Sequence, residues 1–428
     1  MVLLADKFVI PNGVIVLASV WILGHLLFIA IISRENLRRL PLILAGVLFL
    51  VVYLIKPYTY DLEKYSIYFV TGYIPSFHWH TPHDGFQLDP RTTTGYPYTA
   101  YEHGFRWVSK LGNYLLPTGS LVPRYDRDYW DFQERGPPRH DAMVLLISIL
   151  SVTSLVFTTR KLLRASGILK IDRLEDIVLI VVITLGSVYF FIGSQNTIRQ
   201  FLGLLFVLLA VNAVVSKKYI TTIIWILCAS LFHRWAIVFG IVATTAAIGV
   251  MHCIKHSIYT EIRPDRITRL ETLSFVGGIC TVILIKGLAV SGAFHADYPL
   301  IGDLKAYVID QDQFQMFERL ESWVKVVAII VLFGLTEFVQ GTSKIYRQFD
   351  IRLLRRVMLC AILPLAIFPE IFARMLFLYW MIEMVFVISA LLSQQRRTKV
   401  AGLLVFVAYG FAPNALNILL GPQWLRAF

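Results

Sequence analysis

The sequence is poor in charged residues and in cysteine, and each shortage excludes a class of protein. Asp, Glu, Lys and Arg make up 16% of the chain, whereas hydrophobic residues make up 57%. This balance excludes an ordinary soluble domain and indicates an integral membrane protein. The four cysteines fall in apolar stretches, at spacings typical of neither a disulfide framework nor a metal site: Cys228, Cys253, Cys280 and Cys360.

Several recognisable signatures are also missing. The sequence has neither a nucleotide phosphate loop nor the nucleophile elbow of serine hydrolases, and it shows no internal repeat of the transporter kind. Its first residues lack a basic segment and a small-residue cleavage site, so we expect no cleavable signal peptide. The net charge of +12 does not predict a nucleic-acid partner, because membrane insertion alone accounts for the excess.

What the chain does have is a series of long apolar runs, which predict an all-α fold. The hydrocarbon core of a bilayer is about 30 Å thick and requires roughly 17–25 residues per helix. We therefore expect a polytopic membrane protein with about twelve transmembrane helices, in which residues 1–428 form one transmembrane domain. The predicted spans are Val14–Ser33, Pro41–Ile55, Ala142–Thr159, Ile177–Ile192, Phe201–Ser216, Tyr219–Phe232, Trp235–Ile254, Thr272–Ala293, Trp323–Val339, Val357–Phe368, Met375–Ser393 and Val400–Leu420.

Basic residues recur between these spans and predict how the protein is oriented. Six short connections hold 22 of the 40 Lys and Arg residues. Positive residues cluster on the cytoplasmic side of membrane helices, so we expect these connections in the cytoplasm and both termini outside. The six connections are Arg34–Leu40, Arg160–Asp176, Lys217–Lys218, Lys255–Glu271, Gly341–Arg356 and Gln394–Lys399.

Two longer connections are then predicted to face the exterior, residues 56–141 and residues 294–322. The first is rich in aromatic residues, which leaves two interpretations open: anchoring at the headgroup interface or binding of sugar rings. These aromatics include Trp79, Tyr96, Tyr98, Tyr101, Phe105 and Trp107. The same insertion contains His78, His80, His83 and Asp84, but this irregular stretch has no cysteine and we predict no metal site.

The most informative polar cluster is Gln195–Gln200, at the external start of the fifth span. On a helix, Asn196, Arg199 and Gln200 share one stripe with Gly203. A helix N-terminus favours anions, and the planar guanidinium of arginine matches phosphate oxygens. We therefore expect Arg199 to bind a phosphate group. The alternative is an interfacial arginine that reaches toward water.

A second cluster, Phe232-His233-Arg234-Trp235, forms a tight external turn between the sixth and seventh spans. A histidine with an ordinary pKa of about 6.5 exchanges protons near neutral pH. The adjoining Arg234 is expected to lower that pKa, which favours a neutral imidazole as a general base. The alternative is a histidine with a purely structural role.

Further polar residues are spaced as neighbours on a helix. Just outside the second span, Asp61, Tyr65 and Tyr68 share one face. Two other pairs have the i,i+4 spacing of helical ion pairs: Glu102 with Arg106, and Glu370 with Arg374. A plain ion pair on a helix is therefore the alternative to a functional role for these residues.

Three charged residues fall inside predicted spans: Lys286, Lys325 and Glu383. A charge at the centre of a membrane helix costs roughly 2.5–3.5 kcal/mol on insertion scales, so each should face a partner or a wet cavity. Lys286 and Lys325 lie toward the outer half and are placed to meet an anionic headgroup. Tyr379, one turn before Glu383, is placed to cover the carboxylate. Packing against a lysine and catalysis are both open roles for Glu383.

Taken in chain order, these clusters resemble the EpsG/Wzy-type polysaccharide polymerases. The most specific shared features are the Asn-Thr-Ile-Arg-Gln block at 196–200 and the Phe-His pair at 232–233. The chain departs from the family pattern at Arg234-Trp235, where a small polar residue is usual, and in the length of its first insertion. The weaker shared features are Asp61, Tyr65, Tyr68, the Glu-His-Gly-Phe block at 102–105, Arg374 and Tyr379.

The resemblance implies a GT-C-like, metal-independent, inverting glycosyltransferase that needs no cofactor. Its substrate would be an oligosaccharide repeat unit linked to undecaprenyl pyrophosphate, polymerised into O-antigen, capsule or exopolysaccharide at the periplasmic face of the bacterial inner membrane. A flippase and a chain-length regulator are the expected partners. An O-antigen-ligase-like transferase, a membrane O-acyltransferase and a lipid or sugar transporter are the alternatives.

The resemblance also suggests roles for individual residues. The leaving pyrophosphate gains negative charge in the transition state and the attacking hydroxyl benefits from a base. His233 is the first candidate for that base, followed by Glu102 and Asp61. The predicted substrate-binding residues are Arg199, Gln200, Asn196, Arg374, Tyr65, Tyr68, Arg106, Arg234 and Tyr379.

Overall fold

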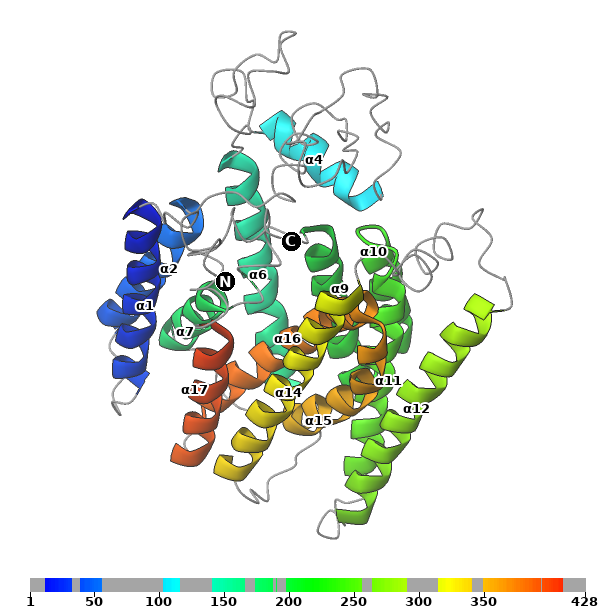
Figure 1. The fold of residues 1–428 in the computed structure, drawn as a ribbon. Helices are drawn as coiled ribbons and strands as arrows, with labels where there is room; N and C mark the ends of the chain where they lie inside the picture. Colours follow the sequence, from blue (N-terminus) through cyan, green and yellow to red (C-terminus); the bar gives the residue numbers. More distant parts are fainter. Residues whose placement is uncertain are drawn as a thin grey trace.

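The computed structural model describes residues 12–32, 39–55, 103–115, 141–165, 174–187, 190, 198–255, 264–290, 315–340, 349–393 and 395–410. Within these residues the chain is helical and contains no strand (Figure 1). Each of the twelve predicted spans overlaps a helix. The helices are α1 (Asn12–Ile32), α2 (Arg39–Ile55), α4 (His103–Leu115), α6 (Asp141–Ala165), α7 (Leu174–Gly186), α9 (Ile198–Val215), α10 (Tyr219–Ser230), α11 (Ala236–Lys255), α12 (Pro264–Val290), α14 (Gln315–Gln340), α15 (Ile351–Ile362), the 3-10 helix η4 (Leu363–Ile367), α16 (Pro369–Leu391) and α17 (Arg396–Gly410).

Helix length and composition support a polytopic membrane protein. Six helical segments in the described part of the chain are long and apolar enough to cross a bilayer: Leu146–Arg164, Ile198–Val215, Ala236–Lys255, Asp265–Leu288, Trp323–Gln340 and Ile371–Leu391. Shorter apolar segments lie in α1, α2 and α10. That all twelve predicted spans cross the membrane, and that their arrangement is GT-C-like, stay predictions.

Two of these helices form the centre of the bundle. In α9 and α16, 78% and 83% of the apolar segment is buried, against 17% in α12 and 22% in α14. Helix α9 packs against α6, α10, α11 and α16, and α16 also contacts α7, α15 and α17. The residues that α9 and α16 carry near their starts are therefore held on the two most buried of the six long apolar segments that the structure describes.

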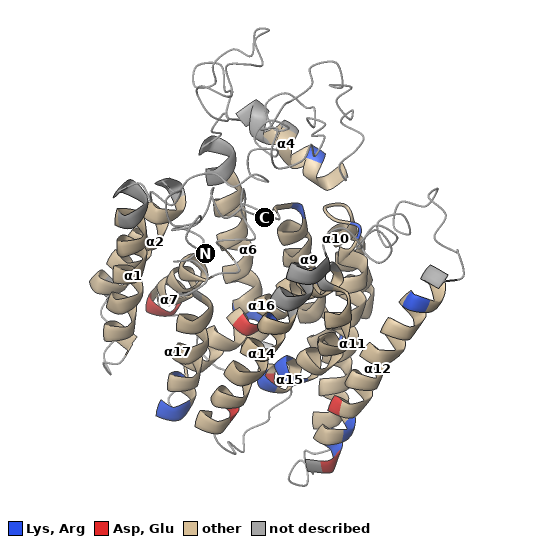
Figure 2. Cartoon of the chain, viewed as in Figure 1, with Lys and Arg blue, Asp and Glu red and all other residues tan. Residues whose placement is uncertain are grey.

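Described basic residues lie at both ends of the bundle, and those next to the predicted basic connections lie toward one of them. Figure 2 shows blue segments at the starts of α12 and α17 and on α15, toward the end opposite α4. We call these the basic end and the α4 end. The distribution agrees with the prediction that the basic connections share one side. Which side of the membrane that is stays a prediction.

Helix α15 corrects one sequence-based expectation. We predicted a cytoplasmic loop over Gly341–Arg356, but a helix begins at Ile351, where the Asp350 side chain accepts a hydrogen bond from the backbone N–H of Arg352 at 2.8 Å. This amphipathic helix of 12 residues is about 18 Å long, too short to cross a bilayer alone. The 3-10 helix η4 then leads into α16. Arg355, expected in a loop, is fully buried.

Candidate functional site

The turn between α10 and α11 holds His233 in a buried position. The backbone N–H groups of Phe232 and His233 both donate to the carbonyl of Ala229 at 3.1 Å, which tightens the end of α10. The carbonyl of His233 then accepts the N–H of Ala236 at 2.8 Å, where α11 begins. His233 is 6% exposed. Its side chain is therefore fixed between two helices, in the tight turn that the sequence predicts.

Helix α9 packs directly beneath this turn through Gly203. A Cβ atom at Gly203 would lie 3.2 Å from the Cβ of Ala236 and 3.5 Å from that of His233, so glycine permits the close approach. Arg199 lies one turn before Gly203 on the same face of α9. The predicted helical stripe is thus present from Arg199 to Gly203, and it brings Arg199 toward His233.

Helix α16 joins the same site through Gln200. The Nε2 of Gln200 donates to the backbone carbonyl of Arg374 at 3.0 Å, although the two residues are 174 positions apart. Gln200 is 3% exposed, so this hydrogen bond is buried. The structure therefore brings together residues from two separate sequence blocks: Arg199 and Gln200 from one, and Arg374 from the other.

Helix α4 docks on the other side of the turn. The backbone N–H of Gly104 donates to the carbonyl of Leu231 at 2.7 Å, and a Cβ at Gly104 would lie 2.8 Å from that oxygen. Phe105 is fully buried, whereas Trp107 is 73% exposed. The Nη2 of Arg106 contacts the Nδ1 of His103 at 2.7 Å. Of the first-insertion aromatics, Phe105 is thus a core residue and Trp107 is available on the surface.

The electrostatics of the site centre on His233. Burial, followed by the positive charges of Arg199, Arg374 and Arg234, lowers the pKa of His233 from 6.5 to about 2. Its Nδ1 is buried and has no hydrogen-bond partner among the described residues. The expected direction of the pKa shift is therefore confirmed. A pKa this low makes His233 a weak base, because a general base works best with a pKa near the working pH.

The starts of four helices meet at this cluster. Helix α11 begins three residues after His233, Arg199 lies in the first turn of α9, α16 begins five residues before Arg374, and the first turn of α4 contacts Leu231. The N–H groups of Gly104 and Ala236 already donate to carbonyl groups, but the positive end of the helix dipole still makes a helix start favourable for an anion. Together with the three arginines, the helix starts give the α4 end a site suited to a multiply charged anion such as a diphosphate.

Tyr379 belongs to a different environment from Arg374, although both lie on α16. It is fully buried, and its hydroxyl donates to Oε1 of Glu383. The prediction that Tyr379 covers Glu383 is confirmed. The ionic partner of Glu383 is Arg355 on α15, not a lysine. Lys286 is exposed on α12, and its predicted contact with a headgroup stays a prediction.

Several predicted residues cannot be placed. Asp61, Tyr65, Tyr68, Glu102 and Asn196 lie outside the described residues, as do the side chain of Glu370 and the His78–Asp84 cluster. Arg355 is the residue that sequence reasoning missed. The signal that could have found it is a capping aspartate, Asp350, followed by arginine and leucine residues at helical spacing.

Comparison with known proteins places the chain in a family. Residues 139–422 match the EpsG family, which is more than half of the chain. No curated protein and no solved structure matches it. The matched range includes Arg199, Gln200, His233, Arg234 and Arg374, and it begins after α4. The chain therefore belongs to the EpsG family, a family of Wzy-type polysaccharide polymerases.

Proposed function

We propose that this protein is a glycosyltransferase that polymerises oligosaccharide repeat units carried on undecaprenyl pyrophosphate. A hydroxyl of the acceptor sugar attacks the anomeric carbon of the donor glycan. The new C–O bond forms as the bond to the pyrophosphate oxygen breaks, the hydroxyl proton passes to a base, and undecaprenyl pyrophosphate leaves. Direct attack inverts the configuration at the anomeric carbon.

The observation that supports this proposal is the group of three arginines around His233. Breaking the glycosyl–phosphate bond places negative charge on the diphosphate, and preorganised cations and N–H groups stabilise that charge. Arg199 is the first candidate because it lies in the first turn of α9, where its guanidinium and the helix dipole act together. Arg374 and Arg234 act on the same region, as their effect on the pKa of His233 indicates. Asn196 and Gln200 would orient phosphate or sugar oxygens.

The low pKa of His233 changes the order of the candidate bases. The charge of a bound diphosphate would offset the three arginines, but burial is the larger cause of the shift and persists. We therefore assign His233 the role of a neutral hydrogen-bonding group. The base is then a carboxylate, with Glu102 ahead of Asp61, because Glu102 directly precedes the turn of α4 that docks beside His233. Trp107, with Tyr65 and Tyr68, would bind acceptor glycan.

The remaining features of the proposal concern location. The basic end would face the cytoplasm, so the α4 end and the arginine cluster would lie on the periplasmic side of the bacterial inner membrane. This is where lipid-linked repeat units are available after a flippase has moved them across. A chain-length regulator would be a further partner.

The direct test is the purified protein with a lipid-pyrophosphate-linked glycan as its sole substrate. Longer lipid-linked chains support the polymerase, whereas transfer to a lipid A acceptor indicates a ligase. Movement of the lipid across the bilayer without new glycosidic bonds indicates a transporter. Either of the last two products would refute the proposal.

Arg199 supplies the sharpest variant. Arg199→Ala should lower turnover by at least about a hundredfold, the loss typical of removing one preorganised transition-state group, while the amount of folded protein stays normal. Arg199→Lys should also fail, because an ammonium cannot reproduce the planar fork. A normal polymer ladder from Arg199→Ala would remove this residue from the site.

The choice of base is tested by a second pair of variants. In the same assay, Glu102→Gln should reduce turnover more than His233→Gln.

A further inference from the structure

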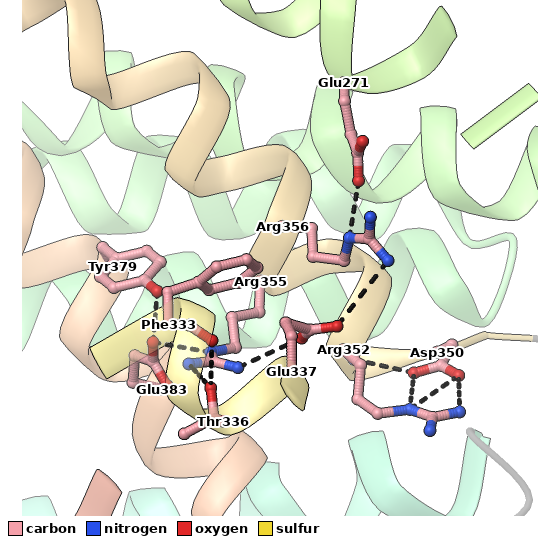
Figure 3. Close-up of polar contacts among 10 residues, drawn as sticks. All are labelled: Glu271, Phe333, Thr336, Glu337, Asp350, Arg352, Arg355, Arg356, Tyr379 and Glu383. Atoms are coloured by element: carbon pink, nitrogen blue, oxygen red, sulfur yellow. Dashed lines mark hydrogen bonds and ion pairs between the residues drawn. The ribbon is translucent and has the colours of Figure 1, made fainter. Parts of the chain in front are cut away.

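A chain of charged side chains runs through the bundle interior, apart from the arginine cluster (Figure 3). At its centre, the Nε of Arg355 on α15 donates to Oε1 of Glu383 on α16 at 2.7 Å. Its Nη2 donates to the hydroxyl of Thr336 at 2.8 Å, and its Nη1 contacts Oε1 of Glu337 at 3.5 Å, both on α14. All three guanidinium nitrogens are therefore engaged, and they link α15 to two neighbouring helices.

Aromatic rings enclose this pair. The guanidinium of Arg355 lies 4.5 Å from the ring centres of both Phe333 and Phe386, and Tyr379 donates to the same Glu383 oxygen. The rings come from α14 and α16, the helices that also supply the polar partners. A planar, delocalised cation suits this enclosure, because it can bond at its edge and stack on its faces at once.

The series of charged side chains continues toward the basic end, where the side chains are more exposed to solvent. Oε2 of Glu337 lies 3.8 Å from Nη1 of Arg356, whose Nε lies 2.6 Å from Oε1 of Glu271 on α12. The side chains of Arg356 and Glu337 are about a third exposed, whereas that of Arg355 is fully buried. Four helices, α12, α14, α15 and α16, are thus joined by alternating charges, and the Arg355–Glu383 link is the one that reaches α16.

A buried ion pair is weak as a source of stability, because desolvation of the charges offsets most of their attraction. Its better-attested use is to specify one arrangement among several. Helix α15 needs such a device: it is short and amphipathic, and inside a membrane apolar contacts alone give helices little preference for one register. The paired charges are satisfied in one alignment of α15, α14 and α16.

Helix α16 connects this pair to the arginine cluster. Glu383 and Arg374 are nine residues apart on one continuous helix, about 14 Å along its axis, and the Arg374 carbonyl accepts from Gln200. We propose that the Arg355–Glu383 pair is a positioning device that sets the register of α16 and thereby places Arg374 beside Arg199 and His233. The importance of this placement for turnover rests on the proposed function.

The placement of α16 can be tested without an activity assay. The hydroxyl of Ser187 lies 3.8 Å from the sulfur of Met384, so cysteines at these two positions should be joined by a short bifunctional thiol reagent once the native cysteines are replaced by alanine. In the Arg355→Met/Glu383→Leu variant, crosslinking should fall to the level seen with only one of the two cysteines present, although the protein remains folded. Arg356→Met is the matched control, because it removes a neighbouring charge on α15 whose direct ion pairs go to Glu337 on α14 and Glu271 on α12, not to α16. Full crosslinking in the double variant, or equal loss in the control, would overturn the inference.

The link to Arg374 is tested by a mutant cycle with the native cysteines present. Arg355→Met/Glu383→Leu should lower turnover by about a hundredfold, the usual effect of misplacing a group by about an ångström. In an Arg374→Ala background the same double change should cost little more, because the group that it positions is already gone. A purely structural role would give additive losses and would contradict the inference. If no variant, including the parent, makes polymer, the proposed function fails while the crosslinking result still stands.

Discussion

His233 gives the arginine cluster a measurable effect on folding. The folded protein holds this imidazole neutral because burial and three arginines lower its pKa from 6.5 to about 2. Below pH 6.5, His233 takes up a proton in the unfolded chain but not in the folded protein, which favours unfolding. The free energy of unfolding is therefore unaffected by this histidine above pH 6.5, and it decreases as the pH falls from 6.5 toward 2. The slope is about 1.4 kcal/mol per pH unit, or about 2 kcal/mol between pH 6.5 and pH 5.

We therefore predict that the protein in detergent is less stable at about pH 5 than at neutral pH, and that His233→Gln reduces this difference. Glutamine keeps a neutral hydrogen-bonding side chain but does not titrate. The measurement is the unfolding temperature of both proteins across this pH range. Parallel pH curves for the two proteins would show that His233 is protonated or exposed in the folded state.

Residue chemistry explains why this cluster could be predicted in part. Arg199, His233 and Arg374 stand out because large polar groups beside apolar spans are costly unless they have a use. Their convergence could not be predicted, because the hydrogen bond from Gln200 to the Arg374 carbonyl joins residues 174 positions apart. Arg355 was missed for the opposite reason: a run of arginines beside a span has the same composition whether it lies in a cytoplasmic loop or on a buried helix face.

At the scale of elements, α4 depends on a glycine. Gly104 lets the helix approach the α10–α11 turn, and a Cβ there would be 2.8 Å from the Leu231 carbonyl oxygen and 3.0 Å from the ring of Phe232. Because the nearest atom belongs to the backbone, the conflict cannot be relieved by a side-chain rotation. We predict that Gly104→Ala displaces α4 from the turn and shortens or abolishes the polymer, without unfolding the transmembrane helices.

The matched control is Gly287→Ala on α12, where an added Cβ meets nothing within 4 Å. Limited proteolysis reports displacement of α4, and helical content by circular dichroism reports the rest of the fold. If Gly104→Ala gave the protease pattern and polymer length of the control, then the docking of α4 would have no part in activity.

Elements also differ in how far their sequence predicted them. Apolar runs such as Trp235–Ile254 correspond closely to α11, because hydropathy over about 20 residues is a strong signal. The segment Val357–Phe368 was predicted as a span, but it is the end of α15 followed by η4. Most of its large apolar residues are buried against other helices, and the local sequence pattern is the same for a helix that packs against protein as for one that packs against lipid. Helix α14 begins at Gln315, inside the predicted loop 294–322. The prediction placed the start of this helix too late because the first turns of α14 carry charged residues, which end the apolar run.

At the scale of the whole molecule, burial and charge describe the same architecture. The central helices α9 and α16 carry Arg199 and Arg374 near their starts, whereas α12 and α14, the least buried of the six long apolar segments described, present apolar surface outward. The charged chain of Arg355 and Glu383 lies between the arginine cluster and the basic end. The molecule thus has one end rich in basic residues, an ionic link in its interior, and a cationic site under α4.

This architecture leads to a prediction about orientation. Leu111 on α4 is 55% exposed and Arg397 at the start of α17 is exposed, so each can be replaced by cysteine in a protein without native cysteines. In intact spheroplasts, a maleimide that cannot cross the membrane should label Leu111→Cys and leave Arg397→Cys unlabelled until the cells are lysed. The reason is that basic segments stay on the cytoplasmic side. The opposite pattern would put His233 and the three arginines in the cytoplasm, where a nucleotide-sugar donor is available, and the proposed use of a flipped, lipid-linked glycan would then be wrong.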